Sequence, residues 1–580
     1  MYSSKKLPKK MTPQKRAKEF DPGVFHVSGD HLFCSSCNVP VDYMRMSSCR
    51  KHLASAVHSR KAEGKVDSND KKRKLQETVS NMFEKQTDQR MQRRVELMSL
   101  VKEFCGANIP LNVIDRPALK SYLEANLSGI GSIPTSRNLR QNYLPKIFEL
   151  HLKELKTLLR NASSIALVCD ETTDPEDRYI FNLLAVDCSE SSPSQPGHKL
   201  RALLLNSVVL DSTNHKTVSE TVLKELYKYE IPLTKISAFV TDNASYMHKT
   251  WSSSLRAVLL NAVHVTCTAH LLNLICEIWQ SEFKAVNDLV VAIKKGFTAC
   301  PSRKARFLQY LRAKGGSEAL PPVPVSTRWN TWFRAAMYHE SHLDDYITFF
   351  KEEAEASSSL TVSNIISLSS CRKIEADLTC LKKYAPHLMS ILTEYETSSV
   401  KAHLLIRELK LLAEWLEISA SAENHQSGKT ALQRSLVKLN SYISEQPTTR
   451  FCQPATRFFN SCQIFDVSYA QIANVDPEVV FDSIPWFDDD TSAKAELKLY
   501  LSSTDELSPD GHPVDFWRAA EKRFPKLSRI AISCLSVPVN SVAAERSFSL
   551  YSAVLRDDRR SIDEANLPVY NMLYQNSSNI

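Results

Sequence analysis

The chain has little glycine and no apolar run long enough to cross a membrane. Only 12 of its 580 residues are glycine, and the composition is that of a globular protein without low-complexity tracts. No stretch approaches the roughly 20 apolar residues that a membrane span needs, so we expect no membrane association. The opening MYSSKKLPKK is basic with no apolar segment behind it, which predicts no secretory signal. The 14 cysteines are therefore expected as core thiols or metal ligands rather than disulfides.

The positive charge of the chain is concentrated at its N-terminus. The net charge is +8, and residues 1–80 alone carry 17 Lys and Arg against eight Asp and Glu. The remainder of the chain is therefore close to neutral. This distribution favours contact of the N-terminal segment with nucleic acid or with a nuclear import receptor, although a solvated basic tail is the simpler alternative. Short basic runs at 5–10 and 71–74 fit nuclear import.

The length is sufficient for about three or four domains. Composition and patterning predict the following divisions: a disordered basic tail over 1–24, a compact Cys/His unit over 25–62, a basic linker over 63–89, a helical region over 90–160, the first part of a sheet-containing domain over 161–279, a helical stretch over 280–530, and the last part of the sheet-containing domain over 531–580.

Strand signals begin after residue 160. Runs of strand length occur at 164–170, 179–188, 200–210 and 236–241, and an amphipathic helix is predicted over 215–229. Three strands, a helix and a fourth strand are the beginning of an α+β domain with a mixed sheet. From about residue 250 onward the pattern is mostly helical.

Four metal-ligand residue types stand close together near the N-terminus. Cys34, Cys37, His52 and His58 form the pattern C-x2-C-x14-H-x5-H, which fits a tetrahedral zinc site. Two cysteines on a tight turn and two histidines on a following helix can reach one ion, and metal binding would supply the folding energy that so small a unit lacks. Cys49 lies nearby and is a competing candidate ligand.

The helical half of this unit is basic. Such side chains can enter the major groove of DNA or follow its phosphates, and binding to another protein is the alternative for a zinc finger. The candidate DNA-binding residues here are Arg45, Arg50, Lys51, Arg60 and Lys61.

Three separated carboxylates form a second candidate site. Asp170 is expected at the end of the first strand in VCDETTD, Asp242 at the end of the fourth in VTDNASYM, and Glu545 on a late helix in SVAAERSFS. A single Asp at a strand end is usually a cap or a surface charge. The three in this order are typical of nucleases with a ribonuclease H-like sheet, where carboxylate oxygens hold two Mg²⁺ or Mn²⁺ ions that activate the nucleophile and stabilise the leaving oxygen.

The N-terminal part resembles known DNA-binding proteins. The Cys/His unit is similar to a BED-type finger, and the blocks FCSSCNVPV, HLASAVHSRKAE and ANIPL with the SIP…LR…YLP run resemble, in order, the vertebrate CGG triplet repeat-binding proteins over roughly residues 13–145.

The rest of the chain resembles hAT transposases over residues 160–575. The blocks VCDETTD, VTDNASYM, CTAH, TRWNTW and PVNSVAAERSFSLYSAVLRDDRR occur in the family's order. The resemblance implies a ribonuclease H-like catalytic domain interrupted by an all-helical insertion, and a dimerisation region in the C-terminal helices. Apolar positions in that region are expected to form an association surface: Phe548, Leu550, Val554, Leu567 and Leu573. It also implies catalytic roles for Asp170, Asp242 and Glu545.

Three smaller points follow from the same resemblance. Trp329, after Arg328, corresponds to a family tryptophan near the cleaved DNA, where an aromatic face can stack on an unpaired base. Cys267 and His270 of CTAH are interpreted as an ordered structural pair beside the active site rather than a second zinc site. Tyr246 departs from the family, which often has an asparagine there.

Two functions fit these observations. The first is an active transposase that binds double-stranded DNA in the nucleus, acts as a homodimer or larger homo-oligomer, and requires Zn²⁺ in its finger and Mg²⁺ or Mn²⁺ for cleavage and strand transfer. The second is a domesticated descendant that regulates transcription without catalysis. The three acidic residues favour the first.

Overall fold

The computed structural model divides the chain into two compact units. Unit 1 comprises residues 1–104 with 110–147, and unit 2 comprises 105–109 with everything from 148 onward. Among the described residues, no helix combines the length and apolar character that a bilayer span requires. The structure describes residues 11–63, 90–189, 199–315, 319–324, 330–356, 359–445, 452–488, 490–504, 507, 511–556 and 562–577.

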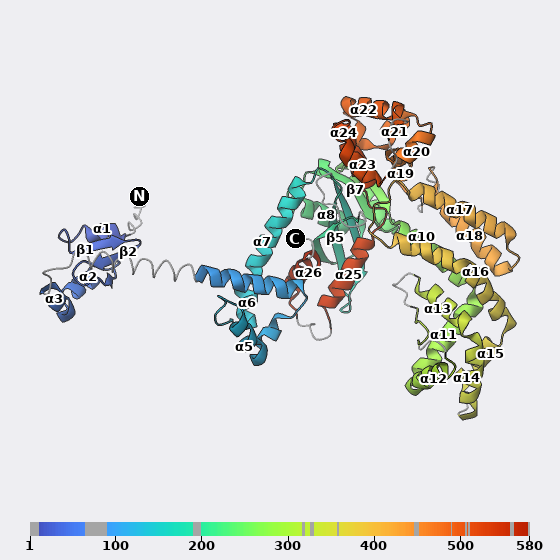
Figure 1. Ribbon diagram of the computed structural model, residues 1–580, viewed down its shortest axis with the longest axis horizontal. Coiled ribbons are helices and arrows are strands. Elements are labelled where there is room, and N and C mark those ends of the chain that lie inside the picture. The colour runs from blue at the N-terminus through green and yellow to red at the C-terminus, as the bar shows by residue number, and fades with distance from the viewer. Residues whose placement is uncertain are drawn as a thin grey trace, which may run out of the picture. The chain divides into compact units, whose positions relative to one another are not determined.

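The N-terminal domain of unit 1 is a small antiparallel sheet with short helices (Figure 1). The sequence predicted that both histidines of the Cys/His unit lie on one helix. The structure has two helices there, separated by Ala54 and Ser55. The elements are α1 (Pro13–Ala17), β1 (Phe25–Ser28), β2 (His31–Cys34), β3 (Pro40–Val41), α2 (Met46–Leu53) and α3 (Ala56–Glu63).

Helix α1 is an ordered part of this domain, which differs from the disordered tail expected over 1–24. Arg16 is buried, donates to the carbonyl oxygens of Tyr43 at 2.7 Å and Met44 at 3.1 Å, and forms an ion pair with Glu19. A guanidinium with this many fixed partners holds the segment in place. Residues 1–10 and the expected linker from residue 64 to 89 lie outside the described residues.

The second part of unit 1 is helical with intervening turns, in keeping with the pattern over 90–160. Residues 90–106 are helical, and η1 (Leu111–Asp115), α5 (Pro117–Asn126) and α6 (Ser136–Asn142) follow. The Asp115 carboxylate accepts hydrogen bonds from the amide and the hydroxyl of Ser136, at 2.8 and 2.6 Å, and so ties η1 to the start of α6.

Unit 2 is built on a five-stranded mixed sheet in the order β6-β5-β4-β7-β8. The first three strands are antiparallel neighbours, and β7 and β8 run parallel to β4. The four strands expected from the sequence are present, with a fifth, β8, at the edge. The strands are β4 (Ile165–Thr173), β5 (Tyr179–Asp187), β6 (Ala202–Leu210), β7 (Ile236–Thr241) and β8 (Val263–Thr266).

Helices cover both faces of this sheet. Asn206 and Ser207 are consecutive in β6, so their side chains point to opposite faces. Asn206 donates to Glu225 of α8 (His215–Lys228) at 2.8 Å, whereas Ser207 accepts from Asn571 of α26 (Leu567–Asn576) at 2.6 Å. Helices α8 and α26 therefore lie on opposite faces.

Helix α25 (Val542–Val554) is fixed to the α26 face by two side-chain hydrogen bonds. Asn182 of β5 donates to the Ser547 hydroxyl at 2.5 Å, and Tyr551, one turn later, donates to Asp174 at 3.1 Å. Asn182 is paired directly with Ser207, which places α25 and α26 over the same face. The sheet and α25 are labelled in Figure 1.

The described residues between β8 and α25 form helices joined by turns and loops. Two further helices precede β8: α7 (Leu144–Asn161) and α9 (Ser245–Ser253). The α-helices between β8 and α25 are α10 (Thr268–Glu282), α11 (Lys284–Ala299), α12 (Pro301–Ala313), α13 (Thr331–Ser341), α14 (Leu343–Ala356), α15 (Leu360–Ser369), α16 (Arg372–Tyr395), α17 (Leu405–Ala422), α18 (Gln426–Ile443), α19 (Thr456–Cys462), α20 (Val467–Ile472), α21 (Pro477–Ser483), α22 (Thr491–Ser502), α23 (Pro513–Ala520) and α24 (Pro525–Leu535).

The residues just before α25 form hydrogen bonds with two earlier helices, α10 and α16. The Thr268 amide donates to the Val539 carbonyl oxygen at 3.0 Å, and the Asn540 side chain donates to the Tyr395 carbonyl oxygen at 2.9 Å. These bonds join the end of α16 and the start of α10 to the residues just before α25. The late helix is therefore returned to the sheet at a defined position.

Candidate metal sites and nucleic-acid surface

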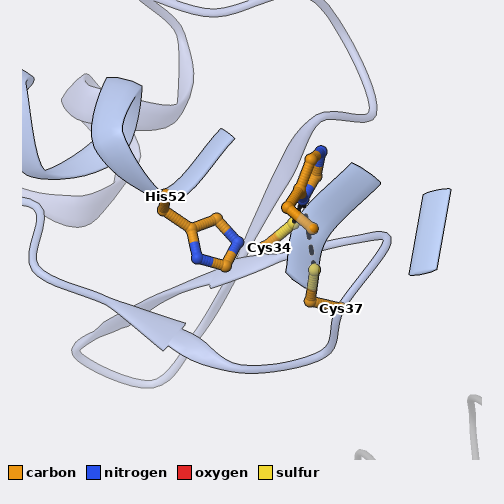
Figure 2. Close-up of side chains that lie close together, drawn as sticks. Cys34, Cys37 and His52 are labelled. Carbon is orange, nitrogen blue, oxygen red and sulfur yellow. Dashed lines mark hydrogen bonds between the residues drawn. The ribbon is translucent and has the colours of Figure 1, made fainter. Parts of the chain in front are cut away.

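The four predicted finger ligands converge on one point. Cys34 lies at the end of β2 and Cys37 on the following turn, while His52 and His58 come from α2 and α3. Their ligand atoms all lie within 4.8 Å of one another, and His58 Nδ1 is 3.3 and 3.1 Å from the two sulfurs. Figure 2 shows Cys34, Cys37 and His52 directed toward the same place. Ligands about 2.0–2.3 Å from a tetrahedral ion are separated by about 3.5 Å, so the geometry fits zinc.

Cys49 is not part of this ligand group. Its side chain is fully buried, and its sulfur lies 3.5 Å from the Asp42 carbonyl oxygen. Burial raises the pKa of the Cys49 thiol, which favours the neutral form over the thiolate that a metal needs. Of the three cysteines, only Cys34 and Cys37 belong to the group whose ligand atoms could hold one ion.

The predicted DNA-contacting side chains of the finger are all exposed. None is required for the packing of the small domain, so they are available to phosphates or base edges. They lie before or on the two short helices: Arg45, Arg50, Lys51, Arg60 and Lys61.

In unit 2, a row of polar side chains crosses the sheet beneath α25 and α26. Asp170 pairs with Asn182, which pairs with Ser207, so the three share one face. The parallel register of β4 and β7 aligns Asp170 with Asp242, which directly follows β7. Asp170 lies inside β4 rather than at its end, because the strand continues through Thr173 in pairing with β5.

Glu545 reaches this row from the first turn of α25. Its Oε1 lies 3.4 Å from His270 Nδ1, and His270 is on the first turn of α10, next to β8. The Asp170 carboxyl is influenced by the charges of His270, Asp242 and Glu545. The three predicted carboxylates therefore lie close enough for their charges to interact around His270, although Glu545 is about 300 residues from Asp242 in sequence. We call Asp170, Asp242 and Glu545 the acidic row.

Burial opposes ionisation of every carboxyl in this group. Burial raises the pKa of Asp170 well above its ordinary range and also raises the pKa of Asp242, with neighbouring carboxylates adding to the shift at Asp170. For Glu545, burial is the largest cause and the pKa rises to about 8. Carboxyls in this condition gain from a nearby cation that compensates their charge.

Glu171 is an additional acidic residue that the sequence analysis did not single out. Burial and the neighbouring Asp242 carboxylate raise its pKa to about 8, and its Oε2 is buried without a hydrogen-bond partner among the described residues. The available signal was the second acid in VCDETTD.

The two residues of the CTAH pair, Cys267 and His270, differ in burial. Cys267 is buried, and its sulfur accepts a hydrogen bond from the Ser541 amide at 3.2 Å, whereas the His270 side chain is 32% exposed and faces Glu545. Cys267, His270 and Glu545 also bring their ligand atoms within 4.8 Å of one another. Asp170 and Asp242 are not in that group.

Two further predictions concern the DNA-contacting residues near Trp329 and the apolar positions of the C-terminal helices. Arg328 and Trp329 lie outside the described residues. Of the apolar C-terminal positions expected to form an association surface, Val554, Leu567 and Leu573 are buried within the chain itself. Phe548 and Leu550 are partly exposed, and Phe548 also packs against the chain's own buried residues.

Comparison with protein families matches both ends of the chain. Residues 7–64 match the CGGBP1 N-terminal domain, residues 87–146 match the CGGBP1 helical domain, and residues 496–577 match the hAT family C-terminal dimerisation region. CGG triplet repeat-binding protein 1 of mouse and of human are each 36% identical over 140 residues, which is 24% of this chain and 81% of theirs. The chain therefore belongs to the CGG triplet repeat-binding protein family over its N-terminal part.

A third relative aligns with most of the chain. It is tpeD of Talaromyces stipitatus, whose name describes a transcriptional regulator, and it is 21% identical over 579 residues, covering 88% of this chain and 64% of its own length. The hAT match covers the segment that contains Glu545, and the CGGBP1 matches cover the finger.

Proposed function

We propose that this chain is a nuclear DNA-binding protein of hAT transposase origin whose unit 2 is a ribonuclease H-like nuclease domain. In this proposal Asp170, Asp242 and Glu545 form the catalytic triad, and the reaction is metal-dependent DNA cleavage and strand transfer. The observation that carries it is the alignment of Asp170 and Asp242 on neighbouring parallel strands, with α25 delivering Glu545 to the same place.

The donor set suits a hard divalent cation. All three proposed ligands are carboxylates, the oxygen donors that Mg²⁺ and Mn²⁺ prefer. Glu545 Oε1 is buried without a hydrogen-bond partner among the described residues, as is Glu171 Oε2, and such oxygens would gain from metal coordination. Bound there, Mg²⁺ or Mn²⁺ would activate a water or a DNA 3′-hydroxyl and neutralise charge on the leaving oxygen.

The protein's own side chains have separate tasks in this proposal. Asp170 and Asp242, on the rigid sheet, fix the position of the acidic site, while Asn182 and Ser547 hold α25 so that Glu545 completes it. The finger, with zinc on Cys34, Cys37, His52 and His58, would bring double-stranded DNA to the enzyme. Association through the C-terminal region would make the active species a homodimer or larger assembly.

The decisive experiment compares cleavage of DNA that carries the gene's own flanking ends by wild type and single variants. Asp170→Asn, Asp242→Asn and Glu545→Gln should each abolish Mg²⁺- or Mn²⁺-dependent cleavage. Asp211→Asn is the matched control, because Asp211 is an exposed carboxylate that also directly follows a strand but lies outside the acidic row. An inert wild type, or triad variants that cleave as well as Asp211→Asn, would refute the enzyme proposal.

The second candidate is a transcription regulator without catalysis. It is favoured by the name of tpeD and by the CGGBP1 matches, which concern proteins named for regulation and for DNA binding. An inert wild type that still binds DNA through the finger would support this function.

A further inference from the structure

A mixed cluster of sulfur, nitrogen and oxygen ligands lies beside the acidic row. Cys267 and His270 are three residues apart at the start of α10, so their side chains lie on the same side of the helix. Glu545 approaches them from α25 and adds a third ligand, so the interpretation of Cys267 and His270 as a structural pair is revised here. The three ligand atoms lie within 4.8 Å of one another, and His270 Nδ1 is 3.4 Å from Glu545 Oε1.

These donors suit a different class of metal from the one proposed for the carboxylates. Thiolate and imidazole select zinc-like ions, whereas Mg²⁺ takes oxygen ligands. Three protein ligands of this kind, with a fourth position left for water, are the usual composition of an open zinc site. The cluster therefore suits a different metal from the one that suits Asp170 and Asp242. Glu545 belongs to both sites.

Backbone hydrogen bonds hold the Cys267 side of the cluster in place. The Ser541 amide donates to the Cys267 sulfur at 3.2 Å. The Cys267 amide is itself bonded to the Thr241 carbonyl oxygen at 2.9 Å, and Thr268 is bonded to Val539. These hydrogen bonds join the sheet, the start of α10 and the segment before α25. The three ligands therefore need little movement to bind one ion.

We propose that Cys267, His270 and Glu545 bind one Zn²⁺-class ion, and that this ion withdraws Glu545 from the magnesium site and so inhibits cleavage. The binding part stands on the cluster alone, while the inhibition part rests on the proposed nuclease function. Glu545 is shared by the two sites. A zinc ion at the cluster and a full carboxylate triad on magnesium are therefore alternatives.

Cobalt spectroscopy of the full chain tests the binding. Co²⁺ replaces Zn²⁺ at such sites and gives a sulfur-to-metal absorption when a thiolate is bound. In a Cys34→Ser/Cys37→Ser background the finger cannot contribute this signal. We expect the absorption to persist there, to disappear on adding Cys267→Ser, and to remain on adding the control Cys276→Ser, a half-buried thiol farther along α10.

His270→Asn and Glu545→Gln, in the same background, guard against a folding defect in the Cys267 variant. Each should weaken cobalt binding and change the visible absorption bands while circular dichroism stays native. Absence of any sulfur-to-cobalt absorption in the starting background would overturn the proposal. Retention of that absorption with Cys267→Ser would do so as well.

Cleavage assays address the inhibition separately. Added Zn²⁺ should suppress Mg²⁺-dependent cleavage by wild type. In Cys267→Ser the fractional suppression, measured against that variant's own zinc-free rate, should be smaller. Equal zinc inhibition of both proteins would refute the inhibition. If cobalt binds as expected but the wild type cleaves no DNA, the nuclease proposal fails and the metal site stands.

Discussion

Replacing Glu545 by glutamine should change how the stability of unit 2 depends on pH. Burial raises the pKa of Glu545 from 4.5 to about 8, so the folded chain retains a proton that the unfolded chain releases. The contribution of this protonated carboxyl to the free energy of unfolding is fully present below about pH 4.5, and it is lost as the pH rises to about 8. Glutamine stays neutral and removes this loss.

The size of the effect follows from the shift. At about 1.4 kcal/mol per pKa unit, the change from 4.5 to about 8 sets a ceiling of about 5 kcal/mol. The side chain is 28% exposed, and solvent reduces the cost of the charge, so we expect about 2–3 kcal/mol. In the metal-free protein, Glu545→Gln should therefore match wild type near pH 4.5 and be more stable by this amount at pH 8.5.

Tryptophan fluorescence is a suitable assay because all seven tryptophans lie in unit 2. Denaturant unfolding with a chelator present would be measured at several values between pH 4.5 and 8.5, with the exposed Glu220→Gln as control. Excess Mg²⁺ at pH 8.5 should then stabilise wild type more than Glu545→Gln. Parallel pH profiles for wild type and Glu545→Gln would refute the reasoning.

Three other predictions concern the rest of the chain. Cys37→Ser should lower the zinc content by about one ion per chain in elemental analysis, whereas Cys49→Ser should leave it unchanged; equal zinc in both would contradict the finger assignment. Arg50→Ala with Lys51→Ala should reduce the salt dependence of DNA binding by about one unit of slope per lost phosphate contact, and an unchanged slope would place the contacts elsewhere. Leu550→Glu should lower the mass measured by light scattering if α25 forms the association surface, and an unchanged mass would exclude this side chain from it.

The order of elements in unit 2 was predictable because hydrophobic periodicity is a local property. The first four strands and α8 stand where the sequence predicted them, and Asp242 follows its strand directly. Strand β8 was not predicted, because its four residues, VHVT, are too few and too polar to produce a strand pattern. It forms because the edge of β7 is available for parallel pairing.

The errors share a physical origin in tertiary contacts. The first strand was expected to end at Asp170, yet it continues through Thr173 because β5 supplies pairing partners as far as Tyr179. Leu567 and Leu573 looked available for association, yet the chain's own packing buries them. Neither partner is close enough in sequence for periodicity to indicate it.

The position of Glu545 could be predicted only by analogy, and the structure gives its physical cause. Two sets of bonds place α25: those from Val539 and Asn540 to the ends of α10 and α16 fix where the helix starts, and the Asn182–Ser547 bond fixes its angle over the sheet. Both sets connect α25 to segments far from it in sequence. The geometry of the acidic row therefore depends on the packing of the helical stretch as well as on the sheet. A change that loosened the end of α16 would move Glu545 relative to Asp170 and Asp242 without altering any carboxylate, because the start of α25 is bonded to that helix.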